Sequence, residues 1–182
     1  MSDYEKFLQC KLNLAPFQLE NYDWEAGWYS PLGSRIIGWE NDAPFAFIEG
    51  YGEMVFSSVS IPYGDHPHTH PVANSFTDFL RLLLATRSAV VIENIYAMTH
   101  ETFDECMQKT DTAHGVDVQR LSRQLQEIFD ITPIQDPYRY VRELQQDFDY
   151  SKFRYPAEYY DYLGIDVPEN LVGLMDIKEP LI

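Results

Sequence analysis

The chain has 182 residues, 45% of them hydrophobic and 15% aromatic, which is enough to bury one substantial core and favours a single domain. Its 29 acidic and 13 basic residues give a formal net charge of −16, which argues against binding to nucleic acid or to anionic membranes. No apolar run approaches the roughly 20 residues that span a bilayer, and Cys10 and Cys106 are too isolated for a disulfide framework, so we expect a cytoplasmic protein.

The first half of the sequence predicts one short helix and then a group of strands. Residues 3 to 9 (DYEKFLQ) indicate the helix, whereas residues 14 to 33 show only weak periodicity. From residue 34 the runs SRIIGW, APFAFIEG and EMVFSSVSI are short and β-rich, with turn residues between them that tolerate positive φ. This pattern is typical of an antiparallel meander of three strands.

The second half predicts helices. A helix capped by Asn74 or Ser75 carries Phe and Leu residues at helical spacing, and further helix starts occur in residues 99–108, 116–130, 136–149 and 156–164. Residues 88–96 (SAVVIENIY) are ambiguous between a strand and a buried helix. We therefore expect a single α+β domain whose antiparallel sheet comes from about residues 34–60, with 88–96 as a further candidate strand, packed by helices mostly from the C-terminal half.

Three alternating histidines, His66, His68 and His70, raise the question of a metal site. In an extended segment, residues at this spacing point to one face, so three imidazoles could meet one ion if His100 or an acid supplied a fourth ligand. Prolines stand between and after them, and nothing in residues 60–76 indicates a buried strand. We therefore expect a solvated loop with no metal and no cofactor.

A base-free stretch suggests where a partner would bind. No lysine or arginine occurs between Arg35 and Arg81. Electrostatic attraction would steer a basic protein toward such a surface, and an aromatic side chain flanked by acids suits an anchor for it. The candidate partner-binding residues are Trp39, Glu40, Asp42, Glu49, Glu53 and Asp65.

The run IIGWENDAPFAFIEGYGEMVFSSVSI, followed by a loop and VANSFTDFLRLLL, resembles the SUKH superfamily, the Smi/Knr-like fold. In that group a strand pair leads through a polar loop into a helix that begins Ser-Phe. Its members include fungal regulators of cell-wall glucan synthesis and bacterial immunity proteins that neutralise toxins, often nucleases. The resemblance covers about residues 34–86; the usual N-terminal helical portion and the Gly-Gly turn before the first strand are not apparent. It implies one SUKH-like domain over residues 1–182, with a helical extension from about residue 100.

No catalytic constellation is visible, because the sequence has neither a Gly-rich phosphate loop nor a Gly-x-Ser-x-Gly elbow. We therefore expect a non-catalytic module, most simply an immunity protein that binds a basic toxin such as a nuclease. Two alternatives remain. One is a small metal-dependent enzyme that uses the three histidines, and the other is a regulatory interaction protein that uses the tyrosines of the C-terminal region.

Overall fold

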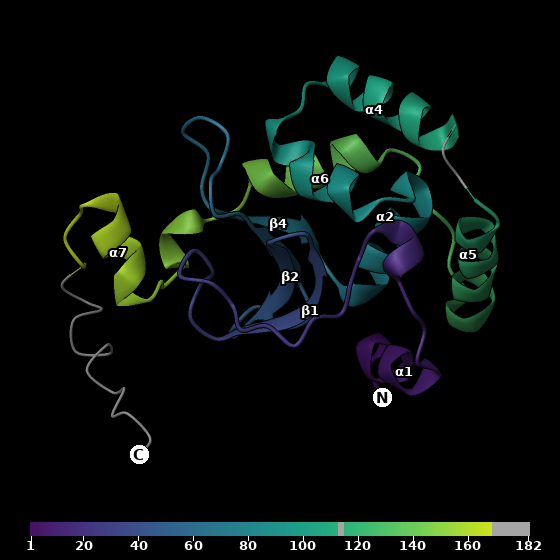
Figure 1. The fold of residues 1–182 in the computed structure, drawn as a ribbon, viewed down its shortest axis with the longest axis horizontal. Coiled ribbons are helices and arrows are strands. Elements are labelled where there is room, and N and C mark those ends of the chain that lie inside the picture. Colours follow the sequence, from purple (N-terminus) through teal and green to yellow (C-terminus); the bar gives the residue numbers. More distant parts are fainter. Residues whose placement is uncertain (113–114, 169–182) are drawn as a thin grey trace.

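A four-stranded antiparallel meander lies at the centre of the protein in the computed structural model, which describes residues 1–112 and 115–168 (Figure 1). Its strands, paired in chain order, are β1 (Ser34–Glu40), β2 (Ala43–Ile48), β3 (Val55–Ser58) and β4 (Thr69–Ala73). Asn41 adopts φ 47° in the β1–β2 turn, and Gly50 adopts φ 91° in the β2–β3 turn, so both turns contain the left-handed residues that their sequences favour. The predicted α+β class and the three predicted strands are confirmed.

The fourth strand corrects the expectation of a solvated histidine loop. Residues 69–73 pair with β3, and His68 and His70 are buried. Pro71 is tolerated because β4 is an edge strand, so the backbone groups along its outer side have no neighbouring strand to pair with. The register of the β3–β4 pairing also shifts beside Phe56, the partner of Pro71. Only the preceding part of the run, up to about residue 67, forms an irregular loop.

The candidate strand at residues 88–96 is wrong, because this segment is helical. It forms α3 (Ala89–Asn94) and the 3-10 helix η2 (Ile95–Ala97). Ser88 caps α3 by accepting a hydrogen bond from the Val91 amide at 3.3 Å. Ala89, Ile92 and Ile95 recur at intervals of three and are fully buried, so packing of one helical face outweighs the β propensity of the branched residues.

The other predicted helices are confirmed, and several begin at the expected caps. Ser75 caps α2 (Phe76–Thr86), and Asp136 caps α6 (Pro137–Gln146), where Pro137 occupies the first helical position. Among the described residues no helix is both long and apolar enough to cross a membrane. The remaining elements are α1 (Asp3–Cys10), η1 (Ala15–Phe17), α4 (His100–Thr112), α5 (Val116–Phe129), η3 (Tyr150–Lys152) and α7 (Ala157–Leu163).

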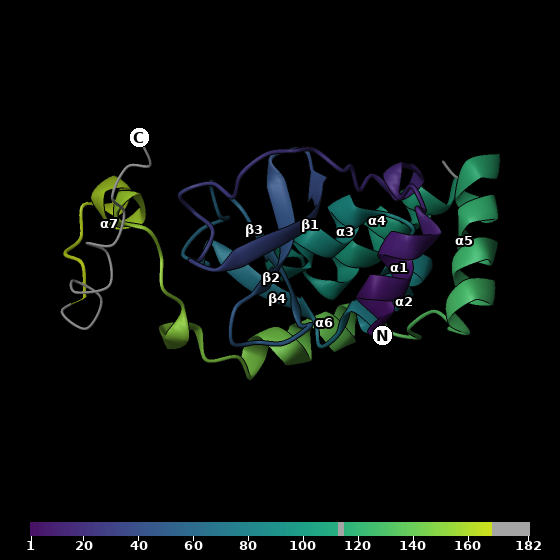
Figure 2. The same ribbon diagram turned by 90° about the horizontal axis from the view of Figure 1, so that it is seen from below.

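Each face of the sheet is covered by a different part of the chain. On one face, Phe45, Phe47 and Val55 join the main core, which α1 to α6 complete. On the other face, Ile48 and Phe56 pack against the C-terminal segment, defined here as residues 148–163. Figures 1 and 2 show α5 and α7 at opposite ends of the molecule, with the sheet between them. The part of the predicted helical extension beyond residue 168 lies outside the described residues.

Candidate functional site

The meander separates the predicted partner-binding acids into two groups. Asp42 lies in the β1–β2 turn and Asp65 in the β3–β4 connection, which are at the same end of the sheet. Glu49 and Glu53 lie in the β2–β3 connection at the opposite end. The six predicted residues therefore cannot form one continuous patch.

Trp39 and Glu40, the centre of the predicted set, are buried. Their exposed fractions are 2% and 7%, so neither side chain is available as a surface anchor in this structure. At Trp39 the preceding part of the chain joins the outer edge of β1, where the backbone N–H and C=O of Trp39 both pair with Glu20 at 2.8 Å.

An exposed stretch next to β1 has aromatic rings flanked by acids, the combination that the sequence analysis predicted around Trp39. We call residues 20–28 the acidic-aromatic segment. Within it, the rings of Tyr22 and Trp24 stack with their centroids 4.4 Å apart and are 40% and 56% exposed. The acids Asp23 and Glu25 beside them are also exposed. Large aromatic rings that face solvent between acids are typical of a binding surface rather than of a core.

The acidic-aromatic segment is fixed to the sheet near both of its ends. Close approach at the first end requires a glycine, since a Cβ at Gly38 would lie 2.7 Å from the Leu19 Cγ. Just beyond the second end, the Tyr29 hydroxyl donates a 2.6 Å hydrogen bond to the Asp42 carbonyl.

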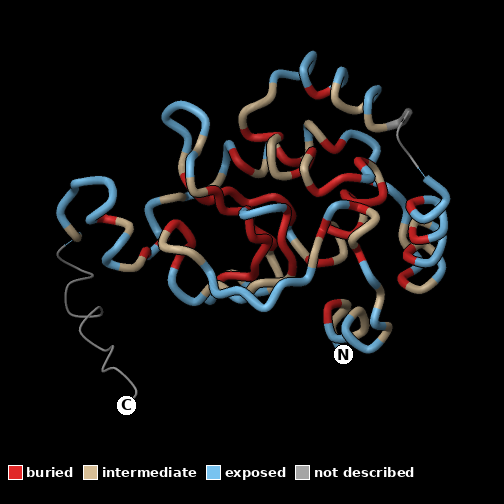
Figure 3. The backbone as a smooth tube through the Cα atoms, in the orientation of Figure 1, coloured by how far each residue is buried: buried red, intermediate tan, exposed pale blue. Residues whose placement is uncertain are grey.

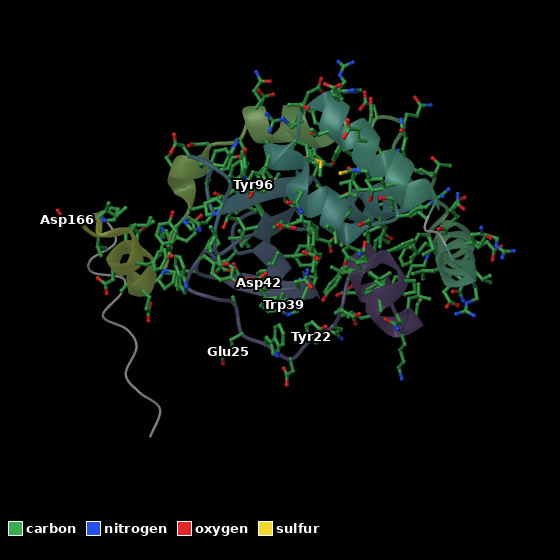
Figure 4. All side chains as sticks on the ribbon, turned by 45° about the horizontal axis from the view of Figure 1, so that its top comes forward. Tyr22, Glu25, Trp39, Asp42, Tyr96 and Asp166 are labelled. Atoms are coloured by element: carbon green, nitrogen blue, oxygen red, sulfur yellow. The ribbon has the colours of Figure 1, made fainter. Side chains whose placement is uncertain are left out.

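Between these attachments the segment crosses the surface as an exposed strip along the lower side of the molecule in Figure 3. In Figure 4 Tyr22, Glu25, Trp39 and Asp42 lie together on this side. The Trp24 and Trp39 rings pack edge to face with their centroids 5.4 Å apart, so the exposed Tyr22–Trp24 pair rests on the buried ring of Trp39.

Lysine and arginine are scarce in the stretch of chain that forms this end of the sheet. Arg35 is the only lysine or arginine between Lys11 and Arg81. Its guanidinium lies 5.0 Å above the rings of Tyr4 and Phe47, near the opposite end of β1. The acids at the Asp42 end therefore present their charge to solvent.

Beneath the Asp42 turn, Glu40 of β1 and Glu93 of α3 form a carboxyl pair. A hydrogen bond joins the two side chains, and each also accepts from an asparagine, Asn41 at 2.6 Å and Asn94 at 2.7 Å. Burial, and then the charge of Glu40, raise the pKa of Glu93 to about 8, and burial also raises the pKa of Glu40. Glu93 therefore keeps its proton at neutral pH, and the pair is a structural contact beneath the surface.

The three loop histidines do not converge on one point. The His68 ring contacts Trp28 and Tyr159, and its Nδ1 lies 2.9 Å from the Val59 carbonyl oxygen. His70 instead stacks on Tyr96, with ring centroids 4.0 Å apart. Within residues 1–112 and 115–168, no three His, Cys, Asp or Glu side chains are arranged to hold a metal ion.

The sequence contained a signal for the acidic-aromatic segment that the weak periodicity of residues 14–33 concealed. In ENYDWE, aromatic and acidic residues alternate, and no basic residue occurs from residue 12 to residue 34. Because alternation alone would equally fit a half-buried strand, the signal for an exposed strip is that acids flank both rings and no base is present to pair with them.

Comparisons of the chain with protein-family models, with curated proteins and with solved structures gave no match, so its resemblance to the SUKH superfamily stays a prediction.

Proposed function

We propose that this protein is a non-catalytic binding module that neutralises a basic protein toxin, with nucleases as the first class to test. The observation that carries the proposal is the exposed Tyr22–Trp24 stack between acids, in a stretch of the chain, residues 12–80, whose only lysine or arginine is Arg35. A nuclease must present positive charge to hold phosphate, so it is a natural complement to this surface. The resemblance to SUKH immunity proteins points in the same direction.

Trp24 takes the role of anchor that the sequence had given to Trp39. A half-exposed tryptophan that is pre-stacked on Tyr22 and supported by Trp39 loses little side-chain freedom on binding. The exposed acids Asp23 and Glu25 flank it in the sequence and Asp42 lies in the turn that follows β1, and these acids would act mainly on the rate of encounter. Because Glu49 and Glu53 lie at the other end of the sheet, they provide a matched control.

The test uses the product of the neighbouring gene, co-expressed and purified with this protein. Reversing Asp23, Glu25 and Asp42 together to lysine should slow association by about tenfold or more at low salt, and the effect should shrink at high salt. Trp24→Ala should instead speed dissociation, by about 30-fold for a loss of roughly 2 kcal/mol.

The control variant carries Glu49→Lys and Glu53→Lys. It should bind nearly as fast as the unchanged protein, since its charges lie away from the acidic-aromatic segment. Equal slowing by both sets of reversals would show that net charge matters and that this segment does not. A complex that tolerates all of these changes would place the interface elsewhere.

A further inference from the structure

A cavity of about 320 Å³ opens between the β3–β4 loop, η2 and α6, next to the end of β4. Figure 1 shows this loop rising beside the end of α6 from which η3 continues. The cavity lies within the size range of small-molecule sites and is lined by side chains from four separate parts of the chain. The lining residues that bear on its chemistry are His66, His70, Tyr96, Arg142, Gln145 and Tyr150.

The cavity is positive in a protein whose net charge is strongly negative. Arg142 supplies this positive charge, and none of the described residues that line the cavity is acidic. The Arg142 Nη1 donates to the Tyr96 carbonyl at 2.7 Å and lies 3.5 Å from the Gln145 Oε1. Within the part of the chain that the structure describes, Arg142 has no carboxylate partner, and its Nε and Nη2 have no acceptor.

His70 provides a second polar group that has no partner. It is 2% exposed, and its Nε2 is buried with no hydrogen-bond partner among the described residues. Burial, and then the electrostatic influence of His66, His68 and Arg142, lower the pKa of His70 to about 3. A buried polar atom without a partner is costly, and here it coincides with a guanidinium that lacks a counter-ion.

The other walls of the cavity are aromatic and neutral. Tyr96 stacks on His70, and the Tyr150 hydroxyl donates to the Gln145 carbonyl at 3.2 Å. Burial raises the pKa of Tyr150 to about 12, so it stays protonated at neutral pH. Gln145 is held by a 3.3 Å hydrogen bond from its Nε2 to the Pro71 carbonyl, which fixes α6 against β4 on this side of the cavity.

We propose that this cavity binds a small organic anion, with its carboxylate or phosphate on the free guanidinium nitrogens of Arg142 and on His66, and its apolar body between Tyr96 and Tyr150. A planar guanidinium with two free donors matches an oxyanion in bidentate geometry. The volume of the cavity exceeds that of a bare oxyanion, so the proposed ligand also carries an apolar organic body. This site is separate from the acidic-aromatic segment and does not depend on the toxin partner.

The test is calorimetric titration with four probes, namely benzoate, phenyl phosphate, inorganic phosphate and the neutral analogue benzamide. Benzoate or phenyl phosphate should bind, and the stronger of the two identifies the headgroup. Benzamide should bind at least tenfold more weakly, because it lacks the charge that Arg142 recognises. Tighter binding of inorganic phosphate than of both organic anions would contradict the role given to Tyr96 and Tyr150.

Variants then locate the binding. Arg142→Gln should abolish it, and Arg139→Gln, on the exposed face of the same helix, is the matched control that should leave it unchanged. Because Arg142 also bonds to the Tyr96 carbonyl, His66→Phe on the exposed loop provides a variant that spares this contact, and it should weaken binding by about tenfold. Absence of heat from all anionic probes at millimolar concentration, or equal binding by the Arg142 and Arg139 variants, would overturn the proposal.

Discussion

Replacing Glu93 with glutamine should make the protein more stable at alkaline pH and leave it almost unchanged at acidic pH. The carboxyl of Glu93 has a pKa of about 8 in the folded protein, against 4.5 when it is unperturbed. Between these values the folded state holds a proton that the unfolded state has released. The free energy of unfolding therefore falls as pH rises through this window.

The magnitude follows from the two pKa values. Each pH unit inside the window costs about 1.4 kcal/mol, so from about pH 5 to about pH 8 the carboxyl at position 93 removes roughly 3 kcal/mol of stability. Glutamine cannot ionise, and its amide can donate to Glu40 as the protonated carboxyl does. Asp42 is the same in both proteins, whereas Glu40 is hydrogen-bonded to position 93, so the difference between the two proteins reports the titration of the Glu40–Glu93 pair.

Urea denaturation followed by tryptophan fluorescence, at about pH 5 and about pH 8, measures this difference. Glu127→Gln, a neutralising change at an exposed position of α5, controls for the loss of one negative charge. If Glu93→Gln changed the free energy of unfolding by the same amount at both pH values, the carboxyl pair could not be sharing a proton in the folded state.

Three further outcomes are expected. Trp39→Ala should lower the free energy of unfolding by about 3 kcal/mol or more, whereas the half-exposed Trp24→Ala should cost about 0.5 kcal/mol, and thermal and urea denaturation of both variants would compare them. Because the folded-state pKa of His70 is about 3, against 6.5 when unperturbed, stability should fall as pH drops below about 6.5, and His70→Gln should flatten that acid limb in the same assay. Asp136→Ala removes the cap of α6 and should cost about 1 kcal/mol, measurable as a lower urea midpoint with an unchanged slope.

The parts of the fold that local chemistry determines were predictable from the sequence. The start of α6 follows from Asp136 and Pro137, and the end of α7 from Gly164, which adopts φ 64°. The β1–β2 and β2–β3 turns likewise follow from Asn41 and Gly50. In each case neighbouring residues decide the backbone conformation, so the sequence window contains the necessary information.

The sequence-based predictions were wrong where contacts between residues far apart in the sequence decide the conformation. The run that contains Pro71 becomes a strand because β3 offers it an edge on which proline is allowed, and residues 88–96 become helical because their buried face meets the core. Trp39 is buried where a part of the chain that has no periodicity lies against it, pairing through Glu20 and packing through Trp24. The cavity beside Arg142 brings α6 against the β3–β4 loop, a juxtaposition that no short window of sequence contains.

The late position of the C-terminal segment in the sequence affects how the protein folds during its synthesis. Ribosomes make the strands first, so the sheet face with Ile48 and Phe56 has no cover until its partners Phe153, Tyr155 and Tyr160 emerge. Nascent chains with uncovered apolar surface are prone to aggregate, and contacts between distant parts of a chain form slowly. The sheet can therefore be sealed on both faces only late in translation, and a growing chain stalled before residue 153 would be a natural client for a chaperone.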